Sequence, residues 1–378
     1  MSEIFFSVKA SHITAISQCF RNMNSVKIVS PLPFRDISVD ILRGFAIAIM
    51  VCANMIPFAL VQPAPFWLRL VSTVAAPLFI FLSGMMVALS CRMKNHTLSY
   101  FLIRGGFVIL IAALLDLGVR GFVPFISVDV LYLIGISLPL AWLFLKLGLR
   151  GRILVISGIL IATPLLQSLA GYDPLPLQVS LLPLLSGAAL PLPAEVLSQW
   201  LVDGWFPLLP WVALSLLGAH TGSFRWKDGG IVSFATGEIA RLAGGMLLVG
   251  ALFWYLWPGA MLTRYGFVEL FYPPTMEFLL AVTGLIFCLF AVVDYLVAAG
   301  YRCDLLKVLG ECSLAIYILH ILVIELLIEP LNLKVPLPIF LAVYALLLSG
   351  MILVAYRIRN IRGMLKSPSY VIRTLTGG

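Results

Sequence analysis

Charged residues are scarce in this chain. Asp, Glu, Lys and Arg make up only 11% of its 378 residues, whereas soluble domains carry about 25%. Hydrophobic residues reach 61%, and the mean hydropathy is +1.07. This composition excludes a soluble globular domain and predicts an integral membrane protein. The apolar runs do not alternate and approach the ~20 residues that a helix needs to cross a bilayer, so we expect helices rather than a barrel.

Cysteine and histidine are also rare. The chain has six cysteines and four histidines, and they form neither a C-x-x-C pair nor a His-rich metal-binding spacing. We place none of the cysteines in an extracytoplasmic segment and therefore expect no disulfide, and the missing spacings predict no metal site. Residues 1–36 lack the continuous apolar core of a signal peptide and mix short apolar pieces with Lys and Arg. We expect them to form a cytoplasmic or interfacial arm.

Ten apolar runs are candidates for membrane-spanning helices. They cover roughly residues 39–60, 69–90, 99–118, 127–147, 152–170, 205–223, 241–258, 276–299, 309–328 and 336–356. The sequence therefore predicts an all-α, polytopic membrane bundle of about ten transmembrane helices. Residues 37–357 form its single transmembrane domain, and residues 358–378 form a basic cytoplasmic tail.

The distribution of Lys and Arg predicts how these helices are oriented. The connections after the second, fourth, sixth and eighth runs are rich in basic residues, as are both ends of the chain, and the other connections are poor in them. Because cytoplasmic loops carry the excess of Lys and Arg, we expect both termini in the cytoplasm. The same pattern accounts for the net charge of +8 without a nucleic-acid partner.

Polar residues within the runs fall into two layers. The inner, cytoplasmic layer contains Asp40, Arg43, Arg104 and His220, and the outer layer contains Asn54, Asp116, Asp129 and Glu325, with Tyr317 and His320 between them. Polar groups at membrane depth are costly and usually face a cavity or a partner. An inner cationic layer and an outer amide and carboxylate layer could pass a group from an anionic cytoplasmic donor to an external acceptor.

Structural roles remain open for most of these residues. Arg43 and Arg104 lie near the interface and could snorkel to it. His220 could interact with a helix end, Asn54 could bond neighbouring helices together, and Asp129 could cap a helix.

His320 is the histidine in the interior of a run, with Tyr317 three residues earlier on the same helical face. Either it is a buried neutral histidine bonded to a neighbouring helix, or it is a general acid or base, because its ordinary pKa of about 6.5 suits proton transfer near neutrality.

Five segments together resemble a known family. In order, they read SVDILRGFAIAIMVCANMIP, APLFIFLSGMMVALS, FPLLPWVALSLLGAHTG, FYPPTMEFLLAVTGL and VLGECSLAIYILHILVI. Their order and spacing resemble those of the heparan-alpha-glucosaminide N-acetyltransferase catalytic-domain family, a transmembrane acyltransferase group with many bacterial members. The resemblance covers roughly residues 35–330. It implies a multi-helix membrane enzyme that moves an acetyl group from cytoplasmic acetyl-CoA to an amino or hydroxyl group of a sugar on the other side.

The resemblance also implies roles for individual residues. Asp40 and Arg43 match the opening motif of the family, and Arg43 suits the anionic CoA. Asn54 matches an active-site position, and His320 matches the histidine of a late YxxxH-like helix. The lysosomal enzyme has a catalytic histidine in the loop after the first span, but that loop here reads FALVQPAPFW and contains no His.

The general base is therefore left to His320 or to a carboxylate such as Asp129. We expect Arg104, Tyr317 and His220 to assist Arg43 and Asp40 in binding the substrates.

The leading hypothesis is thus an acyltransferase that uses acetyl-CoA as co-substrate and acts on an extracytoplasmic saccharide. Its other partners are membrane lipids, and a homodimer is left open. The missing signal peptide favours a multi-pass protein of a bacterial inner membrane over a lysosomal one. Two alternatives use the same polar core: a transporter or flippase for a lipid-linked or amphipathic substrate, and a catalytically silent membrane scaffold.

Overall fold

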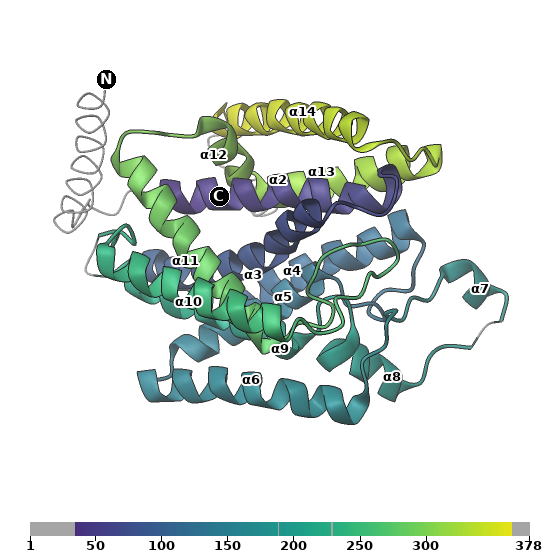
Figure 1. The fold of residues 1–378 in the computed structure, drawn as a ribbon, viewed down its shortest axis with the longest axis horizontal. Helices are drawn as coiled ribbons and strands as arrows, with labels where there is room; N and C mark the ends of the chain where they lie inside the picture. Colours follow the sequence, from purple (N-terminus) through teal and green to yellow (C-terminus); the bar gives the residue numbers. More distant parts are fainter. Residues whose placement is uncertain (1–34, 188, 228–229, 365–378) are drawn as a thin grey trace, which may run out of the picture.

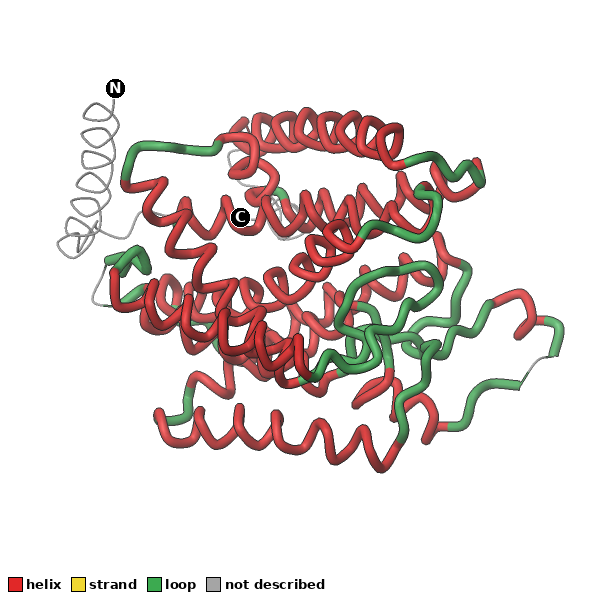
Figure 2. Tube along the Cα trace, in the orientation of Figure 1, coloured by secondary structure: helices red, strands yellow, loops and turns green. Residues whose placement is uncertain are grey.

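The computed structural model describes residues 35–187, 189–227 and 230–364. These residues form helices and connecting segments, with three isolated bridges and no named strand among them (Figure 2). Residues 1–34 of the expected arm and residues 365–378 of the expected tail lie outside the described residues.

The long helices lie side by side, and their connections gather at two ends of the molecule (Figure 1). Those that carry the argument are α2 (Ile37–Ala59), α3 (Phe66–Lys94), α4 (Leu98–Leu115), α5 (Val130–Leu145), α6 (Leu149–Ala170), α9 (Leu208–Arg225), α10 (Gly237–Leu256), α11 (Met276–Ala298), α13 (Ser313–Val323) and α14 (Leu337–Met364).

Shorter elements extend or join the long helices. They are the π-helical turns η1 (Asp116–Arg120), η2 (Gln199–Asp203) and η3 (Ile324–Ile328), the 3-10 turn η4 (Glu329–Leu331), and the helices α7 (Leu181–Leu185), α8 (Pro193–Ser198) and α12 (Asp304–Glu311). We call the end that contains residues 95–97 the inner end, and the end that contains residues 60–65 the outer end.

The predicted all-α membrane fold is confirmed. In the described part of the chain, eight helices are long and apolar enough to cross a membrane, and a pair bent by 43°, Pro193–Asp203 with Leu208–Arg225, raises the number to nine. The remaining predicted run corresponds to α5, which is apolar but has only 16 residues. Each predicted run therefore falls on a helix, although one is short and one is bent.

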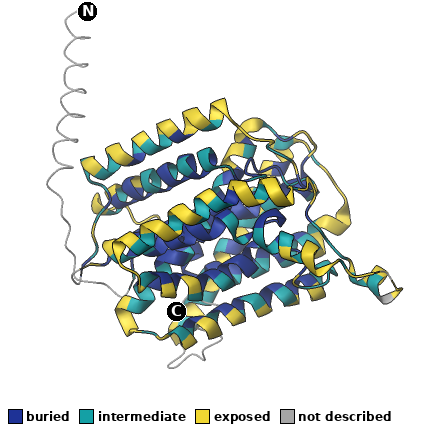
Figure 3. Cartoon of the chain, turned by 90° about the horizontal axis from the view of Figure 1, so that it is seen from below, coloured by how far each residue is buried: buried dark blue, intermediate teal, exposed yellow. Residues whose placement is uncertain are grey.

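The helices differ sharply in how much of their surface is covered. In the most apolar window, 78% of the residues of α2 and 61% of those of α3 are buried, against 6% for α6 and 11% for α10 and α14. Figure 3 shows the buried residues inside the bundle and the exposed ones on its outer helices. α2 and α3 therefore form the core, and the apolar outer faces of α6, α10 and α14 suit contact with lipid.

Small residues allow the core helices to approach closely. A side chain on Gly84 of α3 would lie 1.8 Å from the carbonyl oxygen of Ser215 in α9, and one on Gly218 of α9 would lie 1.9 Å from that of Phe81 in α3. Only glycine lets the two backbones approach so closely at these points.

A buried ion cluster fastens the inner end. The Arg225 guanidinium is 1% exposed and contacts Asp36 through Nε at 2.6 Å and Asp294 through Nη2 at 2.8 Å. Asp36 also caps α2 by accepting hydrogen bonds from the backbone N–H groups of Ser38 and Val39. One cation thereby joins the start of α2 to α9 and α11.

Candidate active site

A cavity of about 420 Å³ opens between the outer halves of the core helices. We call it the outer cavity. Its polar lining consists mainly of Asn54, Ser72, Arg120, Asp129, Glu269, Tyr317, Glu325 and Glu329, and its aromatic lining of Phe58, Trp205, Tyr265, Phe267 and Tyr272. Four carboxylates and one guanidinium thus line a wall that also carries amide, hydroxyl and aromatic side chains.

Arg120 organises three acidic residues on one side of the outer cavity. Its Nη1 lies 2.9 Å from Asp129 Oδ2 and 3.2 Å from Asp116 Oδ1, and its Nε lies 2.9 Å from Glu325 Oε1. Asp116 also accepts a 2.6 Å hydrogen bond from the Tyr132 hydroxyl. The outer layer of carboxylates expected from the sequence therefore exists as a paired network, whose central cation the sequence interpretation had counted only as part of a loop.

Asn54 and His320, which are 266 positions apart in the sequence, lie in direct contact. Asn54 Nδ2 is 2.9 Å from His320 Nε2, and His320 Nδ1 is 3.2 Å from the carbonyl oxygen of Ile316. Because a nitrogen beside a carbonyl oxygen must carry the proton, His320 is the Nδ1–H tautomer, and its Nε2 accepts from the Asn54 amide.

This geometry gives the two residues different positions relative to substrate. Asn54 lines the outer cavity, whereas His320 is fully buried behind it and does not line either cavity. The Tyr317 ring, which does line the cavity, packs edge-on against His320 with ring centroids 5.1 Å apart. His320 therefore fixes the orientation of the Asn54 amide, and its own lone pair is occupied.

Glu269 adds a carboxylate that the sequence interpretation missed. It lies in the connection between α10 and α11, is 6% exposed, and lines the outer cavity. Burial raises the pKa of Glu269 to about 7, against the opposing effect of the nearby Arg69 guanidinium. Its connection also contains Arg264, a basic residue at the end where the charge pattern predicts few of them.

A second cavity, of about 500 Å³, opens at the inner end. We call it the inner cavity. Its charged lining consists of Arg35, Asp36, Asp40, Arg43, Lys94, Arg104 and Arg362. Five basic residues thus face two acidic ones, of which Asp36 is already paired with Arg225. The inner cavity is accordingly positive, and burial together with Lys94 and Arg104 lowers the pKa of His96 beside it.

Three of the predicted cytoplasmic binding residues meet in the inner cavity. Arg43 Nη2 donates a hydrogen bond to the Ser313 hydroxyl, and its Nη1 lies 3.8 Å from Asp40 Oδ1. Asp40 also contacts Arg35 at 3.2 Å. Across the cavity, Arg104 Nη1 donates to the Tyr100 hydroxyl at 2.9 Å. Asp40, Arg43 and Arg104 therefore form one charged site.

His220 is the predicted site residue that lies elsewhere. Its Nδ1 is 3.3 Å from Arg152 Nη1 in α6, its ring packs edge-on against Phe224, and it does not line either cavity. The sequence placed it correctly near the inner end of a helix, but the rotation of α9 turns it away from the site.

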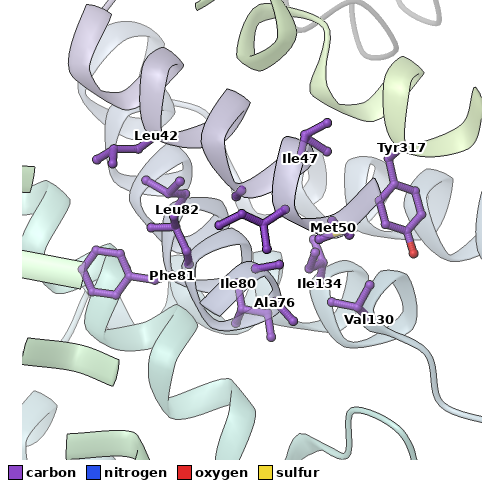
Figure 4. Close-up of a cluster of buried hydrophobic side chains, with 14 of the residues drawn as sticks. Leu42, Ile47, Met50, Ala76, Ile80, Phe81, Leu82, Val130, Ile134 and Tyr317 are labelled. Atoms are coloured by element: carbon purple, nitrogen blue, oxygen red, sulfur yellow. The ribbon is translucent and has the colours of Figure 1, made fainter. Parts of the chain in front are cut away.

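A thin wall of side chains separates the two cavities. Phe79 lines the inner cavity and Tyr317 the outer one, and their rings stack with centroids 6.3 Å apart. Figure 4 shows Tyr317 beside Met50 of α2 and Val130 of α5 in the buried cluster at this level. The stacked pair of Phe79 and Tyr317 therefore stands between the two cavities, and Asn54 lines the outer one on the Tyr317 side.

No group of three or more His, Cys, Asp or Glu side chains in the described residues is arranged to hold a metal ion. The five cysteines among those residues are free thiols. The polar side chains that line the two cavities carry amide, carboxylate, guanidinium, imidazole and hydroxyl groups.

Fold and site together define a polytopic membrane protein with two oppositely charged cavities that almost meet inside the bundle. The family model of heparan-alpha-glucosaminide N-acetyltransferase, catalytic, matches residues 35–258, which is more than half of the chain. The chain therefore belongs to this family, whose members are acetyl-CoA-dependent acetyltransferases, and it is a membrane acetyltransferase. Comparison with curated proteins finds no match. The matched residues include Arg43, Asn54 and Asp129, while Glu269 and His320 lie beyond them.

Proposed function

We propose that the protein transfers the acetyl group of cytoplasmic acetyl-CoA, bound in the inner cavity, to the amino group of a saccharide in the outer cavity. The observation that carries this proposal is the pair of cavities. One is positive and the other is acidic and aromatic, they lie at opposite ends of the bundle, and the stacked rings of Phe79 and Tyr317 stand between them. Membership in the acetyltransferase family favours this reaction over transport and over a silent scaffold.

The inner cavity suits the donor. CoA carries phosphate groups, and Arg and Lys are the side chains that bind phosphate by charge-assisted hydrogen bonds. Arg35, Arg43, Lys94, Arg104 and Arg362 surround this space. The basic connections at the same end favour a cytoplasmic position under the positive-inside rule, and the cytoplasm is where acetyl-CoA is available. The pantetheine arm would extend from these cations toward Phe79 and Tyr317.

The outer cavity suits a sugar that carries an amine. Sugar rings present apolar C–H faces that pack on aromatic side chains, and Trp205, Tyr265 and Phe267 supply them. The excess of carboxylates attracts a cationic amino group and disfavours an anionic acceptor. An acceptor with one amino group close to Asn54 would satisfy both features.

Asn54 is placed to stabilise the reaction where the cavities approach. When the amine attacks the thioester carbonyl, the C–N bond forms, the C–S bond breaks, and negative charge develops on the carbonyl oxygen. One N–H of the Asn54 amide is held by His320, and its second N–H can donate to that oxygen or orient the acceptor. In this proposal His320 is a positioning residue, and Asp129 remains bound to Arg120.

The proposal is tested with protein purified in detergent, radiolabelled acetyl-CoA and glucosamine as the probe acceptor. We expect label to appear on the sugar amine and free CoA to be released in equal amount. Saturable binding of acetyl-CoA without any acetylated amine or released thiol would contradict the proposed reaction. Failure to bind acetyl-CoA would contradict the assignment of the inner cavity as well.

A further inference from the structure

We propose that Glu269 is the general base that takes the proton from the acceptor nucleophile in the outer cavity. This inference rests on the proposed function above and deepens it, because the loop after α2 contains no histidine that could serve as base. It is carried by the position of Glu269 in the cavity wall and by the unused hydrogen-bonding atoms around it.

The backbone on both sides of Glu269 is firmly anchored. Val268 is buried, and its carbonyl oxygen accepts a 2.9 Å hydrogen bond from Arg69 Nε. The backbone N–H of Leu270 donates to the Thr73 hydroxyl of α3 at 2.8 Å. Two hydrogen bonds to one helix thus fix the residues before and after Glu269, so its side chain is held against the cavity rather than free in a loop.

Two polar atoms in this wall have no partner among the described residues. Glu269 Oε2 and Ser72 Oγ are both buried without a hydrogen bond, and both residues line the outer cavity. Buried polar atoms are nearly always satisfied, so an orphaned pair in one cavity indicates a polar ligand. An acceptor amine or hydroxyl at this place would donate to Glu269 and leave Ser72 free to bind a further group of the sugar.

The other carboxylates of the outer cavity are already committed. Asp129 accepts hydrogen bonds from the backbone N–H of Val130 and from Arg120. Glu325 accepts a hydrogen bond from Arg120 as well. An oxygen that is already held by a guanidinium cannot at the same time accept a hydrogen bond along that direction from an acceptor amine. Glu329 lines the cavity from an exposed position. Among the carboxylates that line the outer cavity, Glu269 is therefore the buried one that has an oxygen without a hydrogen-bond partner in the described residues.

The surroundings of Glu269 also suit proton transfer near neutrality. Burial raises its pKa to about 7, while Arg69 of α3 is the cation that opposes this rise. Tyr272 is the neighbouring ionisable group on its own segment, and Arg120, Asp129, Glu325 and Glu329 line the cavity with it. A base whose pKa lies near the working pH accepts and releases a proton most efficiently.

The step balances without a further reactant. The ammonium form that the carboxylates attract first loses one proton to water at the outer end. The neutral amine then attacks the thioester carbon, and its next proton passes to the Glu269 carboxylate as the new C–N bond forms. The C–S bond then breaks, and CoA leaves as a thiolate that takes a proton from water at the inner end. Glu269 returns its proton to water at the outer end, which restores the starting state.

The test measures thiol release from acetyl-CoA by the purified full-length protein, with glucosamine as acceptor and, separately, with water as acceptor. The amine of glucosamine gains and loses a proton with pH, which adds its own pH dependence to the rate. With water as acceptor, the pH dependence near neutrality reports the titration of a group on the protein. Wild-type activity should rise with pH through about 7. In Glu269→Gln we expect kcat to fall by about 100-fold or more and this rise to disappear, with unchanged acetyl-CoA binding. Glu269→Asp should be slower but keep the rise.

A matched control is Glu277→Gln, which changes a carboxylate at the start of α11 that does not line either cavity. It should behave as wild type. An active wild type whose pH dependence survives in Glu269→Gln would overturn the role of Glu269 and leave the proposed function standing. A wild type that releases no thiol to either acceptor would overturn both. Loss of acetyl-CoA binding in Glu269→Gln would overturn the assignment as base, since it would show a structural role.

Discussion

At the scale of single residues, the pair formed by Asn54 and His320 is the clearest result. The sequence identified both as candidates, from one amide and one histidine within apolar runs. It could not show that they touch, because the rotation of a helix about its axis is set by packing against its neighbours. It also could not separate the roles, which depend on which side chain lines the cavity and which lies behind it.

We expect Asn54 and His320 to act as one unit. Asn54→Ala and His320→Ala should each lower kcat for acetyl transfer by about 10- to 100-fold, and the double variant should be little worse than either single one. The measurement is a double-mutant cycle on kcat, with the pH profile as a second readout. The rise through neutrality should persist in His320→Ala. Additive losses, or a rise that vanishes in His320→Ala, would make His320 an independent acid or base.

For a different reason, the sequence did not identify Glu269 and Arg120 as site residues. Both lie at or beyond helix ends, where Lys, Arg, Asp and Glu are read as indicators of topology. The structure brings both to one cavity from connections about 150 residues apart. Only the folding of these connections over the outer end of the bundle reveals their chemistry.

At the scale of helices, the apolar runs predicted the bundle well because helix length and hydropathy are local properties. The sequence did not predict the break before α9 or the short helix α12 ahead of α13. α12 packs against α2 so closely that a side chain on Gly310 would lie 1.8 Å from the carbonyl oxygen of Asp40. Such contacts depend on the whole bundle and are not visible in one run.

The Arg225 cluster gives a prediction at this scale. Arg225→Met would leave the Asp36 and Asp294 carboxylates buried without a cation. Breaking a buried ion pair in this way costs about 3–5 kcal/mol. We therefore expect a clearly lower unfolding temperature in detergent and a lower yield of folded protein. Arg241→Met, at an exposed position of α10, is the control and should leave both unchanged. Equal unfolding temperatures for the two variants would show that the cluster contributes little to stability.

At the scale of the whole molecule, the opposite charge of the two cavities predicts that donor and acceptor binding can be changed separately. Arg43→Gln removes a cation from the inner cavity. We expect the KM for acetyl-CoA to rise about tenfold, equivalent to about 1.4 kcal/mol, while the KM for glucosamine stays the same. Arg150→Gln, an exposed cation at the inner end that does not line the cavity, is the control. An unchanged KM for acetyl-CoA would place the donor elsewhere.

The central claim is that the acetyl group passes from one side of the membrane to the other through the two cavities. The direct measurement uses proteoliposomes with radiolabelled acetyl-CoA sealed inside and glucosamine only outside, since neither molecule crosses the bilayer by itself. We predict acetylated glucosamine in the outer solution and free CoA retained inside, and neither product with the Asn54→Ala protein. Acetylation that occurs only when both molecules are on the same side would contradict the account.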